Sequence, residues 1–143
     1  MSLMVVDASV AVKWILREPG DEAALALLSA YAANKLDLIA PRLLMEEVAS
    51  AISKRCRRRV LSAAEGNAAY RTFALRHPRL VDSASQVNQA LALSVRHHIS
   101  FWDSIYLALA IDRKADLITA DRRFHRAAGR HYPFTKLLGR SLI

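Results

Sequence analysis

Short apolar runs alternate with longer segments of helical periodicity along the whole chain. The runs that are brief and end at a polar residue predict strands, at residues 3–6, 36–41 and 116–120, with a weaker candidate around Phe134. Residues 79–83 form a brief extended connection. Helices are predicted between these pieces, over residues 8–16, 22–34, 42–58, 62–76, 84–98 and 102–114, with a short one after Asp121.

This alternation of strands and helices is typical of a parallel sheet with helices on both faces. The chain has 143 residues and shows no internal repeat, low-complexity segment or linker. We therefore expect one α/β domain that spans residues 1–143.

Composition and hydropathy indicate an ordered protein of the cytoplasm. Hydrophobic residues make up 53% of the chain, yet no apolar run reaches the roughly 18 residues of a membrane span. The N-terminus lacks the basic, apolar and small-residue series of a signal peptide. The single cysteine, Cys56, excludes an internal disulfide and fits a reducing compartment. We expect no contact with a membrane.

The chain is strongly basic, because 21 Lys and Arg against 13 Asp and Glu give a net charge of +8. Such a balance indicates a polyanionic partner, most commonly nucleic acid, although a solvated basic surface is an alternative. Basic residues cluster at Lys54–Arg59 and at Asp121–Arg130. The first cluster ends a predicted helix, where the helix dipole favours cations, so by itself it is weak evidence.

Acidic residues stand at the ends of predicted strands. Asp7 follows the first strand, Asp121 follows the strand at 116–120, and Asp103 begins a very apolar helix. Each can be read as a helix N-cap. In parallel sheets, however, sites form outside the carboxyl ends of the strands. We therefore expect Asp7 and Asp121 at one edge, joined by Asp103 if its helix packs nearby.

Glu47 is an independent candidate. In the helix after Pro41, the apolar stripe contains Leu44, Val48, Ala51 and Ile52. At about 100° per residue, Glu47 lies roughly 60° from Leu44 and inside that stripe, whereas Glu46 faces solvent. A buried carboxylate needs a partner, which can be an Arg, a hydrogen-bond donor or a metal ion.

Acids that converge repel each other unless a cation lies among them. Mg²⁺ and Mn²⁺ prefer oxygen ligands, and such ions can activate water and stabilise charge on a phosphodiester. An acidic cluster within a basic protein is what a nucleic-acid hydrolase needs. The sequence has no HExxH motif, Gly-rich phosphate loop or GxSxG motif that would favour another chemistry.

Four segments in order, VVDASV, APRLLMEEVASAI, ISFWDSIYLALA and LITADRRF, closely resemble the PIN-domain family, and within it the VapC-type toxins of toxin–antitoxin pairs. The resemblance covers essentially the whole chain. It implies a three-layer α/β/α sandwich and a Mg²⁺- or Mn²⁺-dependent endoribonuclease. The metal ligands and catalytic acids that it implies are Asp7, Glu47, Asp103 and Asp121, with Ser9 and Thr119 as supporting hydroxyls.

The resemblance also implies partners. RNA is the expected substrate, a VapB-type antitoxin is the expected inhibitor, and a homodimer is favoured. The apolar helices over residues 21–34 and 62–76 are candidate surfaces for the antitoxin or the second copy. Lys13 and Arg123 lie near the acids in sequence and are candidates for RNA contact, although solvation at the surface is the simpler role for each.

Two other functions stay open. A PIN-like RNA-binding module that no longer cuts would use the same basic surface, but the presence of all four acids argues against it. A receiver-type regulatory domain generally has an acidic pair after its first strand, and this chain has only Asp7 there.

Overall fold

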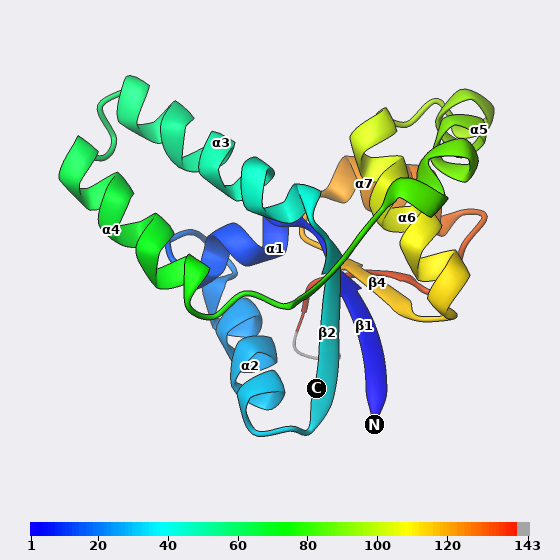
Figure 1. The fold of residues 1–143 in the computed structure, drawn as a ribbon, viewed down its shortest axis with the longest axis horizontal. Coiled ribbons are helices and arrows are strands. Elements are labelled where there is room, and N and C mark those ends of the chain that lie inside the picture. The colour runs from blue at the N-terminus through cyan, green and yellow to red at the C-terminus, as the bar shows by residue number, and fades with distance from the viewer. Residues whose placement is uncertain (140–143) are drawn as a thin grey trace.

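The computed structural model of the protein describes residues 1–139 and has a five-stranded sheet at its centre (Figure 1). The order across the sheet is β3-β2-β1-β4-β5, and all four pairings are parallel. The strands are β1 (Ser2–Val6), β2 (Leu36–Pro41), β3 (Arg79–Val81), β4 (Asp116–Thr119) and β5 (Thr135–Leu137). The predicted fold class, an α/β fold with a parallel central sheet, is confirmed.

Helices connect the strands. They are α1 (Ala8–Ala11), α2 (Asp21–Ala32), α3 (Leu43–Arg57), α4 (Ala63–Ala74), α5 (Val87–His97), α6 (Phe101–Arg113) and α7 (Arg122–Gly129), with the 3₁₀ helices η1 (Val12–Trp14) and η2 (Ala84–Gln86). No helix within residues 1–139 is long and apolar enough to cross a membrane.

The first predicted helix, residues 8–16, is not one continuous α-helix. It is the single turn α1 followed by η1, and the Trp14 indole N–H donates to the carbonyl oxygen of Ala24 at 2.8 Å. This contact with α2 fixes the chain where it turns. The predicted helix 84–98 likewise begins with η2 before α5. The second difference lies at a helix start, where apolar periodicity is least informative.

Strand residues alternate between two cores, one on each face of the sheet. In β1, Met4 and Val6 pack with the α2 residues Ala24 and Leu27. Val5 points to the other face, into the larger core formed with α3, α5 and α6. Because both faces are covered, the strands are almost wholly apolar, as is usual for parallel sheets.

Helix α6 is the centre of the larger core. All of its residues from Ser104 to Ala110 are buried, which agrees with the very apolar sequence of this segment. It packs against β1, β2 and β4. Any residue in its first turn is therefore held close to the ends of the central strands.

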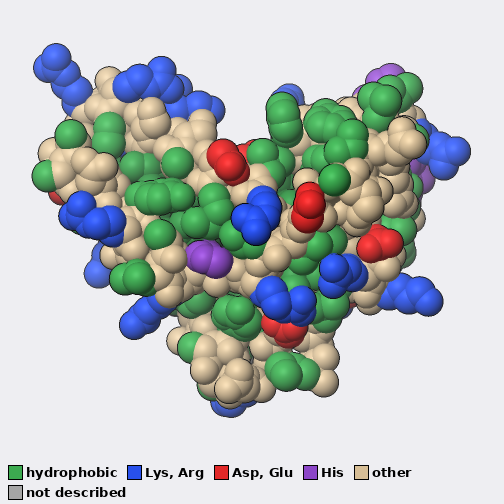
Figure 2. All heavy atoms as spheres, viewed as in Figure 1, with side chains coloured by type: hydrophobic (Ala, Val, Ile, Leu, Met, Phe, Trp, Pro, Cys, Tyr) green, Lys and Arg blue, Asp and Glu red, His purple; other side chains and the backbone are tan. Residues whose placement is uncertain are grey.

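Helices α3 and α4 form an antiparallel arm that projects away from the sheet (Figure 1). Ser62 and Glu65 close a capping box at the start of α4. Gly66 allows the two helices to approach closely, because a Cβ atom there would lie 2.5 Å from Cys56 Sγ. Figure 2 shows a notch between this arm and the α5–α6 side of the molecule, with acidic side chains near it.

Candidate functional site

The site lies where the strand order reverses. The chain moves outward from β1 to β2 and β3, and then returns to the other side of β1 with β4 and β5. Val6 pairs with Ile118, and the Asp7 N–H donates to the Ile118 carbonyl oxygen at 3.3 Å. Asp7 and Thr119 therefore leave the same edge side by side, at the kind of position where open α/β sheets bind ligands.

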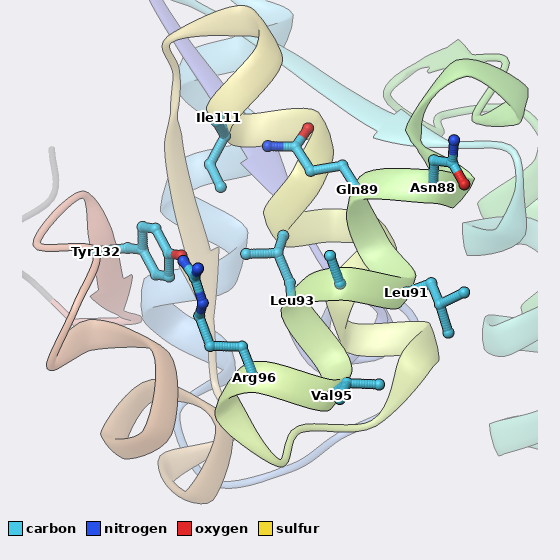
Figure 3. Close-up of a pocket in the computed structure, with 9 residues that line it drawn as sticks. Asn88, Gln89, Leu91, Leu93, Val95, Arg96, Ile111 and Tyr132 are labelled. Carbon is cyan, nitrogen blue, oxygen red and sulfur yellow. The ribbon is translucent and has the colours of Figure 1, made fainter.

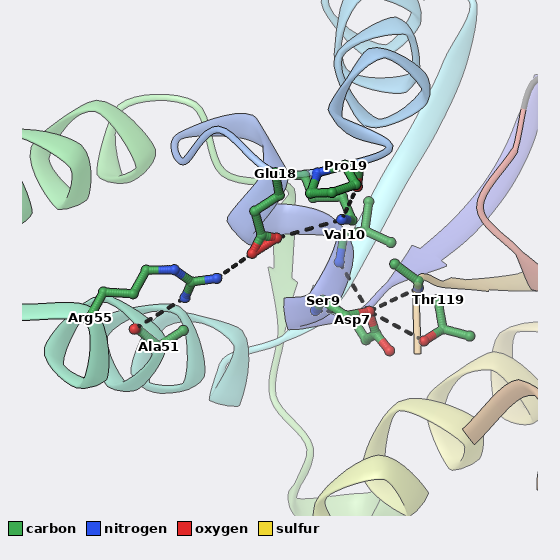
Figure 4. A network of polar contacts seen from close by, with 10 residues as sticks. Asp7, Ser9, Val10, Glu18, Pro19, Ala51, Arg55 and Thr119 are labelled. Carbon is green, nitrogen blue, oxygen red and sulfur yellow. Dashed lines mark hydrogen bonds and ion pairs between the residues drawn. The ribbon is translucent and has the colours of Figure 1, made fainter. Parts of the chain in front are cut away.

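Asp7 is buried, with 4% of its surface exposed, and it caps α1. Its Oδ1 atom accepts hydrogen bonds from Ser9 N at 3.1 Å, Ser9 Oγ at 2.5 Å and Val10 N at 3.4 Å (Figure 4). These donors all bind one oxygen atom and fix the orientation of the carboxyl group.

Ser9 and Thr119 join the ends of β1 and β4. Ser9 Oγ accepts from Ala120 N at 2.8 Å and lies 3.3 Å from Thr119 Oγ1. Thr119 Oγ1 in turn accepts from Asp121 N at 3.1 Å. The two hydroxyls thus connect Asp7 to the backbone that carries Asp121.

The other two aspartates differ in their local roles. Asp121 caps α7, and its Oδ1 atom accepts from Arg123 N at 2.9 Å and Phe124 N at 3.1 Å. Asp103 is not a cap, so that alternative is wrong for this residue. The cap of α6 is Ser100, whose Oγ accepts from Asp103 N at 3.0 Å. Helix capping therefore does not explain the carboxylate of Asp103.

Glu47 has the helical phase that the apolar stripe predicts, since Glu46 is exposed and Glu47 is partly buried. Its partner is a hydrogen-bond donor. The hydroxyl of Tyr106, itself only 1% exposed, donates to Glu47 Oε1 at 2.6 Å. This bond connects α3 to α6 across the site.

Burial and mutual repulsion raise the pKa values of three of these acids. Burial is the main cause in each case; it raises the pKa of Asp7 to about 7, and Asp103 adds repulsion. The pKa of Glu47 rises through burial and then through Asp103, although the Tyr106 hydrogen bond lowers it. The pKa of Asp103 rises through burial and the nearby Asp121. The four carboxylates therefore form one electrostatic unit.

No basic side chain neutralises this unit. None of the four acids takes part in an ion pair within residues 1–139. In the same described part, no three His, Cys, Asp or Glu side chains form a ready-made metal site. Of the four acids, Asp7 is buried, Glu47 and Asp103 are partly buried, and Asp121 is exposed. An external cation would stabilise this group, for which the described residues supply no complete protein cage.

The two basic candidates are placed differently. Lys13 Nζ donates to the Pro19 carbonyl oxygen at 2.6 Å and lies 3.5 Å from Glu18 Oε2. Arg123 is exposed in the first turn of α7. Its backbone N–H binds Asp121.

Sequence reasoning missed Tyr106. It stands three residues after Asp103, so both belong to one face of α6. The role of its hydroxyl was overlooked because a tyrosine within an apolar helix is usually interpreted as a core residue. A buried tyrosine does need a hydrogen-bond partner, and a buried glutamate on another helix was available.

A hollow on the surface of α5 lies away from the acids (Figure 3). It has a volume of about 690 Å³ and is lined mainly by α5, with Ile111 and Tyr132. Val87, Leu91 and Val95 form an exposed aliphatic stripe on that helix. We expected partner surfaces on the helices over residues 21–34 and 62–76, but of the large hydrophobic residues in those ranges only Leu25 and Leu75 are exposed.

Comparison with protein families matches residues 4–130 to the PIN domain. The chain belongs to the PIN-domain family. This confirms the resemblance carried by the four segments. A comparison with curated proteins found no match.

Several solved structures share the fold at low identity. PAE2754 from Pyrobaculum aerophilum is 21% identical, with a TM-score of 0.66 over 88% of this chain and 86% of that one. VapBC2 from Rickettsia felis, bound to a DNA fragment from its promoter, is 18% identical, with a TM-score of 0.65 over 94% and 96%. VapC20 from Mycobacterium tuberculosis, a toxin that cleaves the sarcin–ricin loop, is 19% identical, with a TM-score of 0.64 over 87% and 95%.

The raised pKa of Asp7 predicts how stability depends on pH without metal. Its unfolded-state pKa is near 3.8 and its folded-state pKa about 7, so the folded protein binds more protons between these values. The free energy of unfolding therefore falls as pH rises through this window. Asp7→Asn keeps the capping oxygen and cannot ionise. In EDTA above pH 7 we expect it to be more stable than wild type by roughly 2–4 kcal/mol in urea unfolding.

Asp112→Asn is the matched control, because Asp112 is exposed and has only a surface ion pair with Arg113. It should leave stability nearly unchanged. A difference between Asp7→Asn and wild type that stays constant from pH 4 to 8 would contradict the assignment.

Tyr106→Phe tests the bond between α6 and α3. Removing the hydroxyl leaves the partly buried Glu47 without this donor, so the pKa of Glu47 should rise and the free energy of unfolding at pH 8 should fall by about 1–2 kcal/mol. Tyr70→Phe is the control, since the partly buried Tyr70 hydroxyl makes no hydrogen bond within residues 1–139. Equal stability of the two variants would show that the Tyr106 hydroxyl is not needed.

Proposed function

We propose that this protein is a Mg²⁺- or Mn²⁺-dependent endoribonuclease, the toxin of a VapBC-type pair, acting in the cytoplasm as one domain. The observation that carries the proposal is a group of acids at the carboxyl edge of the sheet in a PIN-family chain, of which Asp7 is buried and Glu47 and Asp103 are partly buried. None of these acids has an ion-pair partner within residues 1–139. Stability alone does not account for Asp103, because Ser100 already caps its helix. The net charge of +8 suits a polyanionic substrate.

The residues fit a divalent cation. Asp7, Asp103 and Glu47 would hold it, with Asp121 as a direct or water-mediated ligand. Within residues 1–139 no three acids form a ready-made site, and Mg²⁺ usually keeps several waters beside one or two carboxylates, so some of these acids would hold the ion through water. When bound, such an ion supplies the positive charge that activates water and stabilises a phosphodiester under attack.

The chain's own residues prepare this site. Ser9 orients the Asp7 carboxyl group, and Thr119 holds the backbone at Asp121. Tyr106 fixes Glu47 from the opposite wall. Each bond limits the freedom of a ligand before substrate arrives, which is how supporting hydrogen bonds tune metal sites.

We also propose a VapB-type antitoxin as the partner that keeps the enzyme inactive, and a homodimer as the assembled form. The support is the fold shared with the toxin–antitoxin proteins VapBC2 from Rickettsia felis and the toxin–antitoxin complex from Klebsiella pneumoniae.

Cleavage of total cellular RNA by purified, antitoxin-free protein tests the activity. Discrete fragments are expected with Mg²⁺ or Mn²⁺ and none with EDTA. Asp103→Asn should lower the rate at least about a hundredfold, because a ligand is lost while the Ser100 cap is kept.

Asp112→Asn changes charge equally on the exposed side of the same helix and should cleave like wild type. If wild type and Asp103→Asn both bind RNA and leave it intact with every metal, the protein is an RNA-binding module instead.

A further inference from the structure

One face of α3 carries both Glu47 and a row of basic residues. At about 100° per residue, Lys54 and Arg58 lie within about 20° of the direction of Glu47. Ala51, a small residue, lies between them on the same face. Arg57 lies about 80° away, and Arg59 follows the helix end. The acid of the site and two exposed cations therefore share one stripe along the arm.

This stripe lines a groove with a volume of about 450 Å³. Its walls include Ala8 and Glu47 at one end and Lys54 and Arg58 at the other. A second hollow adjoins it through Ala8, Ala51 and Arg55 and reaches Ser9. The groove thus begins beside the acids and ends among cations. Figure 2 shows basic side chains gathered along the edge of the arm, at its end far from the notch.

Glu18 fixes the wall between the two hollows. Its carboxylate pairs with Arg55 of α3 and lies 3.5 Å from Lys13 Nζ (Figure 4). Arg55 also donates to the Ala51 carbonyl oxygen at 3.3 Å. The loop before α2 is in this way connected to the arm. Two partly exposed cations are held at the rim instead of extending freely into solvent.

We propose that this groove binds the backbone of the RNA strand that continues from the cleaved phosphodiester, with Lys54 and Arg58 contacting phosphates. The inference rests on the proposed function and adds the path that the bound RNA strand takes away from the acids. An RNA strand carries a phosphate at every nucleotide, so it can place one at the acids and others at the cations. The groove is continuous with Glu47, which favours substrate over an unrelated acidic protein segment.

The experiment compares two double variants with equal charge loss at the same end of α3. Lys54→Gln with Arg58→Gln removes two of the cations that line the groove and leaves Arg55, which is paired with Glu18. Arg57→Gln with Arg59→Gln removes two cations that do not line it. Binding of a labelled single-stranded RNA is measured in EDTA over a range of salt, with thermal unfolding as a check on folding. Polyglutamate, an acidic polymer without phosphate groups, is titrated in parallel.

The groove variant should bind RNA several-fold more weakly, and the slope of log K against log salt should fall by about 1.4, or 0.7 for each lost phosphate contact. The control variant should stay close to wild type. Equal losses in both variants, or no loss in either, would overturn the proposal. So would weaker polyglutamate binding with unchanged RNA binding, which would assign the groove to an acidic protein segment. Because no cleavage is needed, a wild type that fails to cut RNA disproves the nuclease separately.

Discussion

The structure depends on one electrostatic constraint, which is that carboxylates brought together in a poorly solvated place cannot all ionise without a cation. A parallel sheet collects residues that follow its strands at one edge, so Asp7 and Asp121 arrive there through topology. Helix α6 adds Asp103, and α3 adds Glu47 from across the notch. Burial then raises the pKa values of Asp7, Glu47 and Asp103, and this makes the site demand positive charge.

In the function that we propose, the same helix resolves the conflict between an acidic site and an anionic substrate. Near the sheet, α3 presents Glu47, and farther along the arm it presents Lys54 and Arg58. Separating the two charges along one helix lets a cation neutralise the acids while fixed basic residues attract the nucleic acid. In this proposal the α3–α4 arm serves two purposes, since Leu44, Val48 and Phe73 also pack into the larger core.

Much of this could be predicted from particular residues. The apolar runs before Asp7 and Asp121 predicted the parallel strands, and the helical phase separated Glu47 from Glu46. The predicted start of α6 was one residue too late, so Ser100 was not recognised as its N-cap. Apolar periodicity does not locate a cap. The bond between Tyr106 and Glu47 joins residues 59 positions apart, and periodicity along the chain carries no information on such pairs.

The most direct measurement is the number of protons released when the RNA-free protein binds Mn²⁺ at pH 6.5. Calorimetry in two buffers with different ionisation enthalpies gives that number. Asp7, whose pKa is about 7, is largely protonated at this pH and must ionise to bind the cation. The account predicts binding that releases a large fraction of a proton or more per ion and that Asp7→Asn weakens. Absence of binding, or binding without proton release, would contradict it.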